Sequence, residues 1–419
     1  MPRLPESLAV LREPDYRRVL AAQGVSVLGD RMVVVALAFA VLEIGGGPSA
    51  VGLVFACQAL PMVLSLLAGG VVADRASRRA VMVVTDLLRL ASQGAMAALL
   101  LAGVAEVWML AALAAVTGAA TGFFNPAATG LMPAIVAPER LQQANGLRSS
   151  AMATGEILGP ALGGVLVVTV GPGWALGVDA ATFALSAALL ARLALPRHVA
   201  RPATGFLREL LEGWDAFRSR TWVWALVATI AFSNMLWGAW NALGPVAAER
   251  SLGGAAVWGT ILACMGIGGV VGGVLAVRLA PSRPLVLMVV ADLAFCLPLA
   301  ALAAGAPGVG VAAGALLAGV ALMLANTLWE STLQRHIPPE TLSRVSSYDW
   351  FGSLAFYPVG LALWGPLAAW IGLQEALWLA SGLLLLSAPV LLSVRDIREL
   401  PLYPRTPVVP APDGVTPAG

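Results

Sequence analysis

The sequence predicts an all-α membrane protein whose twelve transmembrane helices form two pseudo-symmetric halves of six helices each. Three observations predict this fold class: the composition, the long charge-free runs and an internal repeat. Of the 419 residues, 59% are hydrophobic and 11% are charged, against about 45–50% and about 25% in ordinary soluble domains. A soluble fold of this size cannot bury so much apolar surface, because the buried fraction levels off near about 75%. Lipid must therefore solvate the rest.

The charge-free runs predict where the helices lie. Runs such as Ile44–Ala73, Val107–Pro138 and Ser251–Val277 contain no charged residue, and each exceeds the about 20 residues that cross the hydrocarbon core of a bilayer. Breaks rich in Gly and Pro, such as Gly45–Pro48, separate neighbouring runs. The predicted helices cover residues 19–43, 49–73, 80–102, 107–130, 141–168, 174–195, 222–248, 254–277, 284–304, 309–329, 343–369 and 374–394.

The arginines predict the orientation in the membrane. All 25 basic residues are arginines; only Arg250 lies in a predicted outer loop, and Arg31, Arg89 and Arg148 lie within predicted helices. The others gather on one side, which the positive-inside rule identifies as cytoplasmic. We therefore expect a multi-pass protein of a bacterial inner membrane with both termini in the cytoplasm. The net charge of +2 gives no reason to expect a nucleic acid partner.

The two halves repeat one another. Met82–Leu87 matches Met288–Leu293 at a shift of 206 residues, and Gly159 matches Gly360 at a shift of 201. Parallel six-helix repeats with a site between them are a transporter architecture. One chain holds both halves, so a monomer is sufficient. The predicted parts are an N-terminal half (1–195), a cytoplasmic linker (196–221), a C-terminal half (222–394) and a cytoplasmic tail (395–419).

The linker has apolar residues at helical spacing, among them Leu207, Leu211, Trp214 and Phe217. This spacing predicts an amphipathic segment on the membrane surface. A solvated linker with incidental periodicity is the alternative.

The predicted loop between the second and third helices combines a small residue with four charges: Gly70, Asp74, Arg75, Arg78 and Arg79. The glycine allows close helix packing, and the charges suit a gating latch between the inner ends of the halves. The pattern resembles the G-x-x-x-D-R-x-G-R-R loop of the major facilitator superfamily, with Ser77 in place of the inner glycine. Arginines that merely obey the positive-inside rule are the alternative.

The predicted fifth helix carries a second pattern, formed by Gly146, Gly155, Gly159, Pro160, Gly163 and Gly164. Three of these glycines lie on one face, where a neighbouring helix can pack on bare backbone, and the proline bends the helix. The pattern resembles the antiporter motif of drug:proton exporters in the same superfamily. Generic packing of small residues in a glycine-rich protein is the alternative.

The superfamily resemblance covers about residues 15–395. It implies alternating access driven by a proton gradient, with no cofactor. Asn125–Pro126, Leu141 and Gly159–Pro160 look closer to the branch of siderophore and macrolide exporters, which implies efflux of a hydrophobic or amphipathic small molecule and a part in multidrug resistance. The predicted fourth helix lacks the arginine that many proton-coupled relatives carry there, so that role is not carried over.

Charged residues inside predicted helices are functional candidates, because their burial in lipid is costly. Asp30 and Arg31 lie at the centre of the otherwise uncharged run Val19–Leu42, and Glu156 lies within the fifth-helix motif. We expect Asp30 to be the first choice for proton coupling, with Glu156 the second and Arg31 a partner. A structural ion pair between Arg31 and either carboxylate is the alternative.

A further set of charges is predicted to form an inner gate: Asp86, Arg89, Arg148, Asp292 and Asp349. Asp86 and Arg89 can pair, because they lie three residues apart on one helix. We expect Asp86 and its repeat counterpart Asp292 to face loop arginines. Asp179 and Asp349 lie near predicted helix ends, where each can reach water.

The predicted seventh helix presents an amphipathic aromatic stripe that suits a large, mostly apolar ligand. The candidate substrate-cavity residues are Asn234, Trp237, Trp240 and Asn241, with Trp329, Glu330 and Tyr357 from later helices. Packing or interfacial roles are the alternative for the tryptophans.

The sequence therefore predicts a secondary active efflux transporter that works by proton antiport, with uptake by symport or facilitated diffusion as the alternative. No Walker A loop is present, so ATP does not drive it directly. The two histidines, His198 and His336, form no hydrolytic motif, and the three cysteines lack CxxC spacing. We expect neither an enzyme nor a metal site, and the cargo stays open.

Overall fold

The structure is a computed structural model that describes residues 10–137, 140–194, 214–215, 217–279 and 281–401, and its regular structure is entirely helical. Twelve helical segments in these ranges are long and apolar enough to cross a membrane. The predicted fold class, an all-α membrane protein with twelve such helices, is therefore confirmed. Most of the predicted linker and tail lies outside the described residues.

Six helices form the N-terminal half: α1 (Pro14–Glu43), α2 (Pro48–Arg75), α3 (Arg78–Leu101), α4 (Val107–Ile135), α5 (Leu141–Val170) and α6 (Pro172–Ala191). Proline lies in the first turn of α1, α2 and α6, where its missing N–H costs no helical hydrogen bond. Gly171, at φ 89°, joins α5 to α6. Within this half α1 packs on α5 and α6, while α3 packs on α4 and α6.

The C-terminal half is divided into more segments: α8 (Thr221–Ala247), the π-helix η3 (Ala248–Leu252), α9 (Ala255–Arg278), α10 (Pro284–Asp292), the 3-10 helix η4 (Leu293–Phe295), α11 (Cys296–Ala303), α12 (Gly308–His336), α13 (Pro339–Leu354), α14 (Tyr357–Ile371), α15 (Leu373–Ser393) and the short α16 (Arg395–Glu399). Here α8 packs on α13, α14 and α15, and α9 packs on α12.

Two helices predicted as continuous are interrupted in the C-terminal half. The predicted helix 284–304 is divided by η4 into α10 and α11, and the predicted helix 343–369 is divided into α13 and α14 at residues 355–356. Hydropathy does not reveal these interruptions, because the apolar character continues through both. Their repeat counterparts α3 and α5 are unbroken.

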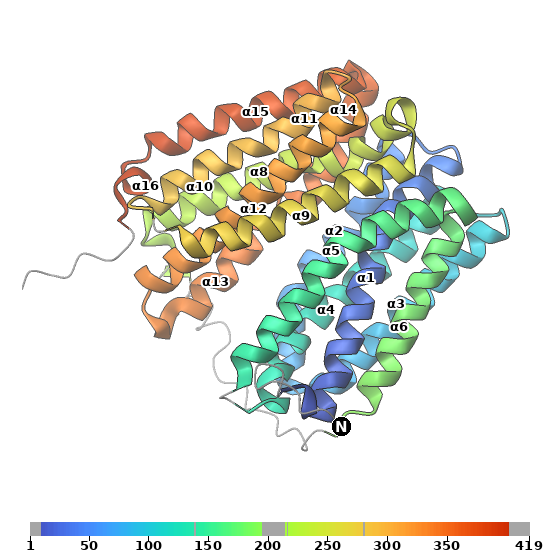
Figure 1. The fold of residues 1–419 in the computed structure, drawn as a ribbon, viewed down its shortest axis with the longest axis horizontal. Helices are drawn as coiled ribbons and strands as arrows, with labels where there is room; N and C mark the ends of the chain where they lie inside the picture. The colour runs from blue at the N-terminus through green and yellow to red at the C-terminus, as the bar shows by residue number, and fades with distance from the viewer. Residues whose placement is uncertain (1–9, 138–139, 195–213, 216, 280, 402–419) are drawn as a thin grey trace, which may run out of the picture.

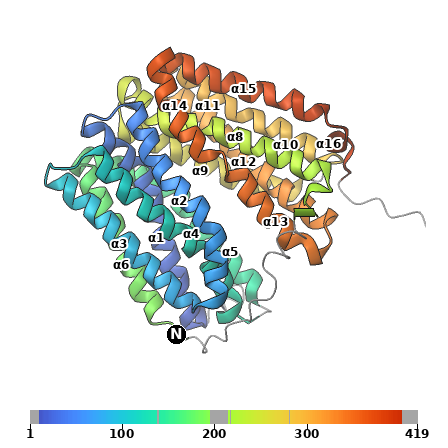
Figure 2. The same ribbon diagram turned by 180° about the vertical axis from the view of Figure 1, so that it is seen from behind.

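The two halves form a V that is closed at one end and open at the other (Figures 1 and 2). At the closed end α5 crosses α9 and α2 packs on α14. The contact is between backbones: a Cβ on Gly164 would collide with Ala255 and Ala256, and a Cβ on Gly365 would collide with Pro48 and Ser49. These residues lie at the helix ends that the arginine distribution places outside, so the predicted cytoplasmic side is the open one.

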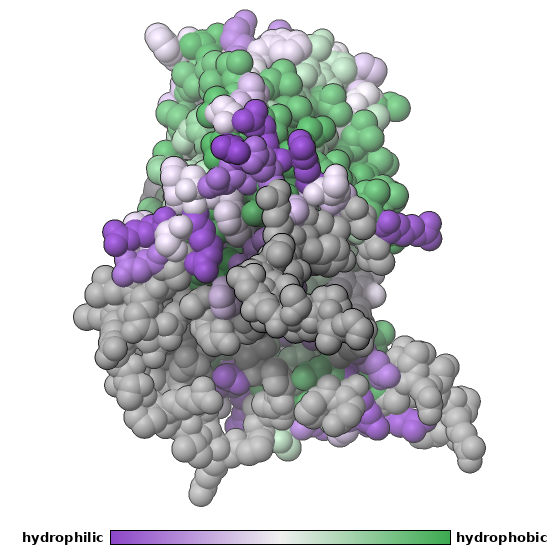
Figure 3. Space-filling view, turned by 90° about the vertical axis from the view of Figure 1, so that its left-hand side faces the viewer, coloured by the Kyte–Doolittle hydropathy of each residue, from purple (hydrophilic) through white to green (hydrophobic). Residues whose placement is uncertain are grey.

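The outer surface of the bundle is apolar. Large side chains such as Leu64, Val309, Trp370 and Val390 are exposed, as expected for a lipid-facing surface. Figure 3 looks onto the open end of the V: hydrophilic residues gather there, below a hydrophobic expanse on the C-terminal half.

Candidate functional site

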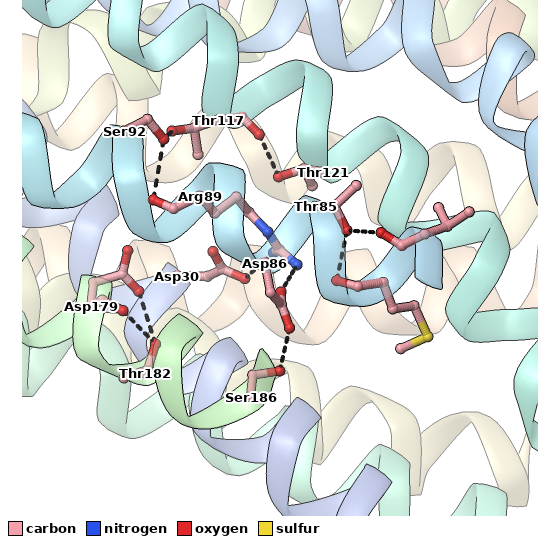
Figure 4. A network of polar contacts seen from close by, with 12 residues as sticks. Asp30, Thr85, Asp86, Arg89, Ser92, Thr117, Thr121, Asp179, Thr182 and Ser186 are labelled. Carbon is pink, nitrogen blue, oxygen red and sulfur yellow. Dashed lines mark hydrogen bonds and ion pairs between the residues drawn. The ribbon is translucent and has the colours of Figure 1, made fainter. Parts of the chain in front are cut away.

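A buried guanidinium organises the polar interior of the N-terminal half (Figure 4). Arg89, on α3, is 2% exposed and donates a hydrogen bond of 2.6 Å to Asp86 Oδ1. It also pairs with Asp30 on α1, at 3.8 Å between Nη1 and Oδ2. The guanidinium lies over the rings of Phe124 and Phe183, 4.3 Å and 4.4 Å from their centroids. Arg89 is therefore held by charge and by cation–π contacts from four helices.

A third carboxylate lies beside this pair. Asp179, on α6, is fully buried; its Oδ1 accepts a hydrogen bond from the Thr182 hydroxyl at 3.3 Å, and its Oδ2 has no hydrogen-bond partner among the described residues. The backbone of α1 comes close at Gly29, where a Cβ would collide with Asp179 and Thr182. Figure 4 shows Asp179 and Asp30 on neighbouring helices near Arg89.

This cluster thus places three carboxylates near one guanidinium (Figure 4), and two of them, Asp86 and Asp30, pair with it. The Ser186 hydroxyl donates a hydrogen bond of 2.6 Å to Asp86 Oδ2. This hydroxyl is neutral, so it does not offset the negative charge of the carboxylate. A buried carboxylate without a counter-charge is costly. Binding a proton removes the excess charge, and Asp30, with 39% of its side chain exposed, is the most accessible of the three.

These positions correct two predictions. The predicted pairing of Asp86 with Arg89 is confirmed, but both residues lie inside the N-terminal half and not against loop arginines, because α6 and α1 supply their other partners. Asp179 does not reach water, because α6 packs against α1 and α3 at this level. No sequence pattern signals this burial, because it depends on which helices pack against α6 at this level.

The other proposed coupling residues form a separate ion pair. Arg31 Nη2 lies 2.5 Å from Glu156 Oε1, and both side chains are 43% exposed. This pair joins α1 to α5 beside the crossing of α5 with α9, because a Cβ on Gly266 of α9 would collide with the Glu156 backbone. For Glu156 the structure therefore shows the alternative, an ion pair with Arg31. Asp30 pairs with Arg89 instead.

The fifth-helix motif has two packing faces. A Cβ on Gly155, Gly159 or Gly163 would collide with α1, whereas Gly164 packs on α9 of the other half. Pro160 lies inside α5, and its carbonyl oxygen approaches Gly259 of α9. One motif thus joins α5 to its own half and to the opposite half.

Other predicted gating residues make contacts within the N-terminal half. Arg79 donates to the Leu193 carbonyl after α6 at 2.7 Å, and Arg148 donates to Gln23 Oε1 on α1 at 2.7 Å. A Cβ on Gly146 would meet no atom within 4 Å. The surroundings of Gly70 and the side chains of Asp74 and Arg75 lie outside the described part of the structure, so the latch stays a prediction.

The C-terminal half contains a cavity of about 330 Å³ between α8, α10, η4, α12 and α13. Both helix interruptions border it, since Asp292 and Phe295 flank the first and Leu354 precedes the second. Its lining residues are Ile230, Ser233, Asn234, Trp237, Met288, Asp292, Phe295, Leu322, Ala325, Asn326, Trp329, Glu330, Asp349, Trp350, Ser353, Leu354 and Leu384. Discontinuous helices frame the substrate sites of many secondary transporters.

The aspartates of this cavity accept hydrogen bonds from neutral donors in the described residues. Asp292 Oδ2 accepts from the Ser233 hydroxyl at 3.0 Å. Asp349 Oδ2 accepts from the Trp329 indole N–H at 3.0 Å, and its Oδ1 accepts from the Ser353 hydroxyl at 3.4 Å. Asp292 and Asp349, predicted as gate residues, thus line the cavity, because α10 and α13 turn these positions inward.

Four of the predicted cavity residues do line it: Asn234, Trp237, Trp329 and Glu330. Three do not. Trp240 is buried in the core, stacked on Trp237 and tilted against Trp258, and Asn241 bonds back to the Trp237 carbonyl at 3.5 Å. Tyr357 packs beside a small apolar cluster of α2 and α14. Helical spacing placed Trp240 and Asn241 on one stripe with Asn234 and Trp237, but the stripe extends beyond the cavity.

Comparisons with known proteins agree with this fold. The sequence model described as Major Facilitator Superfamily matches residues 19–353. The chain is 28% identical to the enterobactin exporter EntS of Escherichia coli O157:H7, over 97% of this chain and 98% of that protein. It is 23% identical to macrolide efflux protein A of Streptococcus pyogenes, over 92% and 97%. The crystal structure of the nucleoside transporter NupG superposes with a TM-score of 0.73 at 12% identity, over 90% of this chain and 98% of that one.

Proposed function

The chain belongs to the Major Facilitator Superfamily of membrane transporters, and we propose that it exports an amphipathic small molecule in exchange for protons. The observation that carries the proposal is the excess of carboxylates around Arg89 (Figure 4), since Asp30 and Asp86 pair with it and the buried Asp179 lies beside them without a cation of its own among the described residues. Export is supported by the fifth-helix motif and by relatives named as an exporter and an efflux protein.

Asp30 is the proton-accepting group in this proposal. It is the accessible member of the cluster, and its charge pairs with Arg89 across α1 and α3. A proton on Asp30 weakens that pair, because a neutral carboxyl no longer attracts the guanidinium by its charge. Asp86 on α3 and the rings of Phe124 and Phe183 then hold Arg89.

A continuous set of contacts leads from this cluster to the interface between the halves. Arg31 follows Asp30 on α1 and pairs with Glu156 on α5. The backbone of Glu156 touches α9 of the other half at Gly266. In the proposal, a change at Asp30 reaches the α5–α9 crossing through one helix and one ion pair, a contiguous route of the kind along which coupling can travel.

The test is substrate-dependent proton movement in proteoliposomes with an imposed pH gradient, using a panel of macrolides, siderophores and cationic drugs. We expect proton flux from the wild type on adding a substrate, and loss of that flux in Asp30→Asn. The matched control is Glu106→Gln. Glu106 is an exposed carboxylate between α3 and α4, and we expect its variant to keep the proton flux.

Two results would overturn the proposal. Substrate movement without any proton flux would identify a facilitator. Substrate and protons that move in the same direction would identify a symporter that imports its cargo.

A further inference from the structure

We propose that the cavity of the C-terminal half receives the positively charged group of an amphipathic organic cation, held by Asp292, Glu330 and Asp349 and by the surrounding aromatic rings. This inference rests on the proposed function only in treating the cavity as the place where cargo binds. It names a substrate class by charge, and it separates amine-bearing compounds from acidic ones.

The first step is the charge of the cavity wall. Its described lining includes Asp292, Glu330 and Asp349 but no arginine, lysine or histidine. Asp349 is 7% exposed, and its hydrogen bonds come from an indole and a hydroxyl. Neutral donors solvate a carboxylate but leave its charge in place, so a ligand cation would complete the site.

The second step compares Asp292 with Asp86, its counterpart in the N-terminal repeat. In the N-terminal half Asp86 has its own cation three residues later, Arg89. At the same shift of 206 residues, Asp292 is followed three residues later by Phe295. The C-terminal half thus keeps the acid and has an aromatic ring where the internal cation stands in the other half. In this proposal the ligand supplies the cation that the described lining of the cavity lacks.

The third step is the aromatic wall. Trp237 and Phe295 meet edge to face, with centroids 4.7 Å apart, and Trp350 lines the same cavity with 62% of its surface exposed. Aromatic faces attract ammonium and other organic cations within about 6 Å. Anions gain nothing from these faces, and the three carboxylates repel them.

The fourth step is size. A volume of about 330 Å³ falls at the lower end of the about 300–1,000 Å³ typical of small-molecule pockets. Ile230, Met288 and Leu322 add apolar surface. The cavity therefore suits the charged and aromatic part of a drug-sized molecule and is too large for a simple metal cation.

The test compares two ions of the same shape and opposite charge, tetraphenylphosphonium and tetraphenylborate. Binding to the purified full chain in detergent is followed by tryptophan fluorescence, because Trp237, Trp329 and Trp350 line the cavity. No proton gradient is applied. We expect saturable binding of the cation and at least about tenfold weaker binding of the anion.

Variants locate the site. Glu330→Gln, Asp292→Asn and Asp349→Asn should each weaken cation binding by about tenfold, and Glu375→Gln, an exposed carboxyl at the start of α15, should leave it unchanged. Glu330 is exposed, so its variant keeps the fold even if a buried Asp→Asn variant does not. The inference is overturned if the anion binds as well as the cation, or if Glu330→Gln and the folded aspartate variants all bind like the wild type.

Failure of this inference differs from failure of the proposed function. Charge-selective binding without proton exchange in proteoliposomes would remove the antiport proposal and leave the cation site standing. Proton exchange with an anionic or neutral cargo, together with equal binding of the two test ions, would remove the cation site and leave the antiport proposal standing.

Discussion

The two halves use the same helical framework around the same acid in opposite ways. In the N-terminal half Asp86 is closed off by Arg89 and Ser186 on the unbroken helices α3 and α6. In the C-terminal half Asp292 lines an open cavity beside the interrupted helix α10–η4–α11. The comparison sets a buried ionic network in one half against an acid-lined cavity in the other, where we propose that the cation binds.

The largest expected effect comes from removing the cation of the closed network. Arg89→Leu leaves Asp86 buried without a counter-charge, and breaking a buried pair in this way costs about 3–5 kcal/mol. We expect a clear drop in the thermal unfolding temperature in detergent. Combining Asp86→Asn with Arg89→Leu should recover part of the lost unfolding temperature, because the buried side chain at position 86 is then neutral.

The matched control for this prediction is Arg395→Leu. Arg395 pairs with Glu399 on the surface, with side chains 79% and 52% exposed, and exposed pairs contribute little. An unfolding temperature for Arg89→Leu equal to that of this control would show that the network does not stabilise the N-terminal half.

A smaller effect is expected from giving the C-terminal half the arrangement of the N-terminal half. Phe295→Arg places a guanidinium three residues after Asp292, as Arg89 follows Asp86. We expect about tenfold weaker binding of tetraphenylphosphonium, equal to about 1.4 kcal/mol, because the internal cation competes for the carboxylate. Phe295→Leu removes the ring without adding charge and should weaken binding less. Equal loss in both variants would assign the effect to the ring alone.

The smallest effect is expected at the pair that joins the N-terminal half to the interface. Arg31 and Glu156 are each 43% exposed, so solvent screens their attraction, and such pairs contribute about 0.2–1 kcal/mol. A double-mutant cycle with Arg31→Gln and Glu156→Gln should give a small coupling energy for unfolding. The same cycle, measured on the rate of proton-driven transport, should give a larger coupling energy if this pair links Asp30 to the interface between the halves. Equal and small couplings in both measurements would remove the pair from the mechanism.

Much of the fold could be predicted from the sequence, because span length and arginine distribution are direct consequences of the bilayer. The Asp86–Arg89 pair followed from helical spacing alone. The place of Asp179 did not, because its burial depends on how α6 packs against α1 and α3. The cavity position of Asp349 did not follow either, because it depends on how α13 packs against α8 and α12. Trp240 was misplaced because a helical stripe does not say where the cavity ends.

The division of labour between the halves is tested most directly by proton release on cation binding. Tetraphenylphosphonium is added to the purified full chain in weakly buffered detergent solution, and released protons and bound cation are measured together for the wild type and for Asp30→Asn. We expect the wild type to release protons as the cation binds. Asp30→Asn should release none and still bind the cation, but with weaker affinity, because the uncharged amide mimics the protonated carboxyl and binding linkage is reciprocal. Unchanged proton release in Asp30→Asn, or loss of its cation binding, would contradict a proton site in one half and a cargo site in the other.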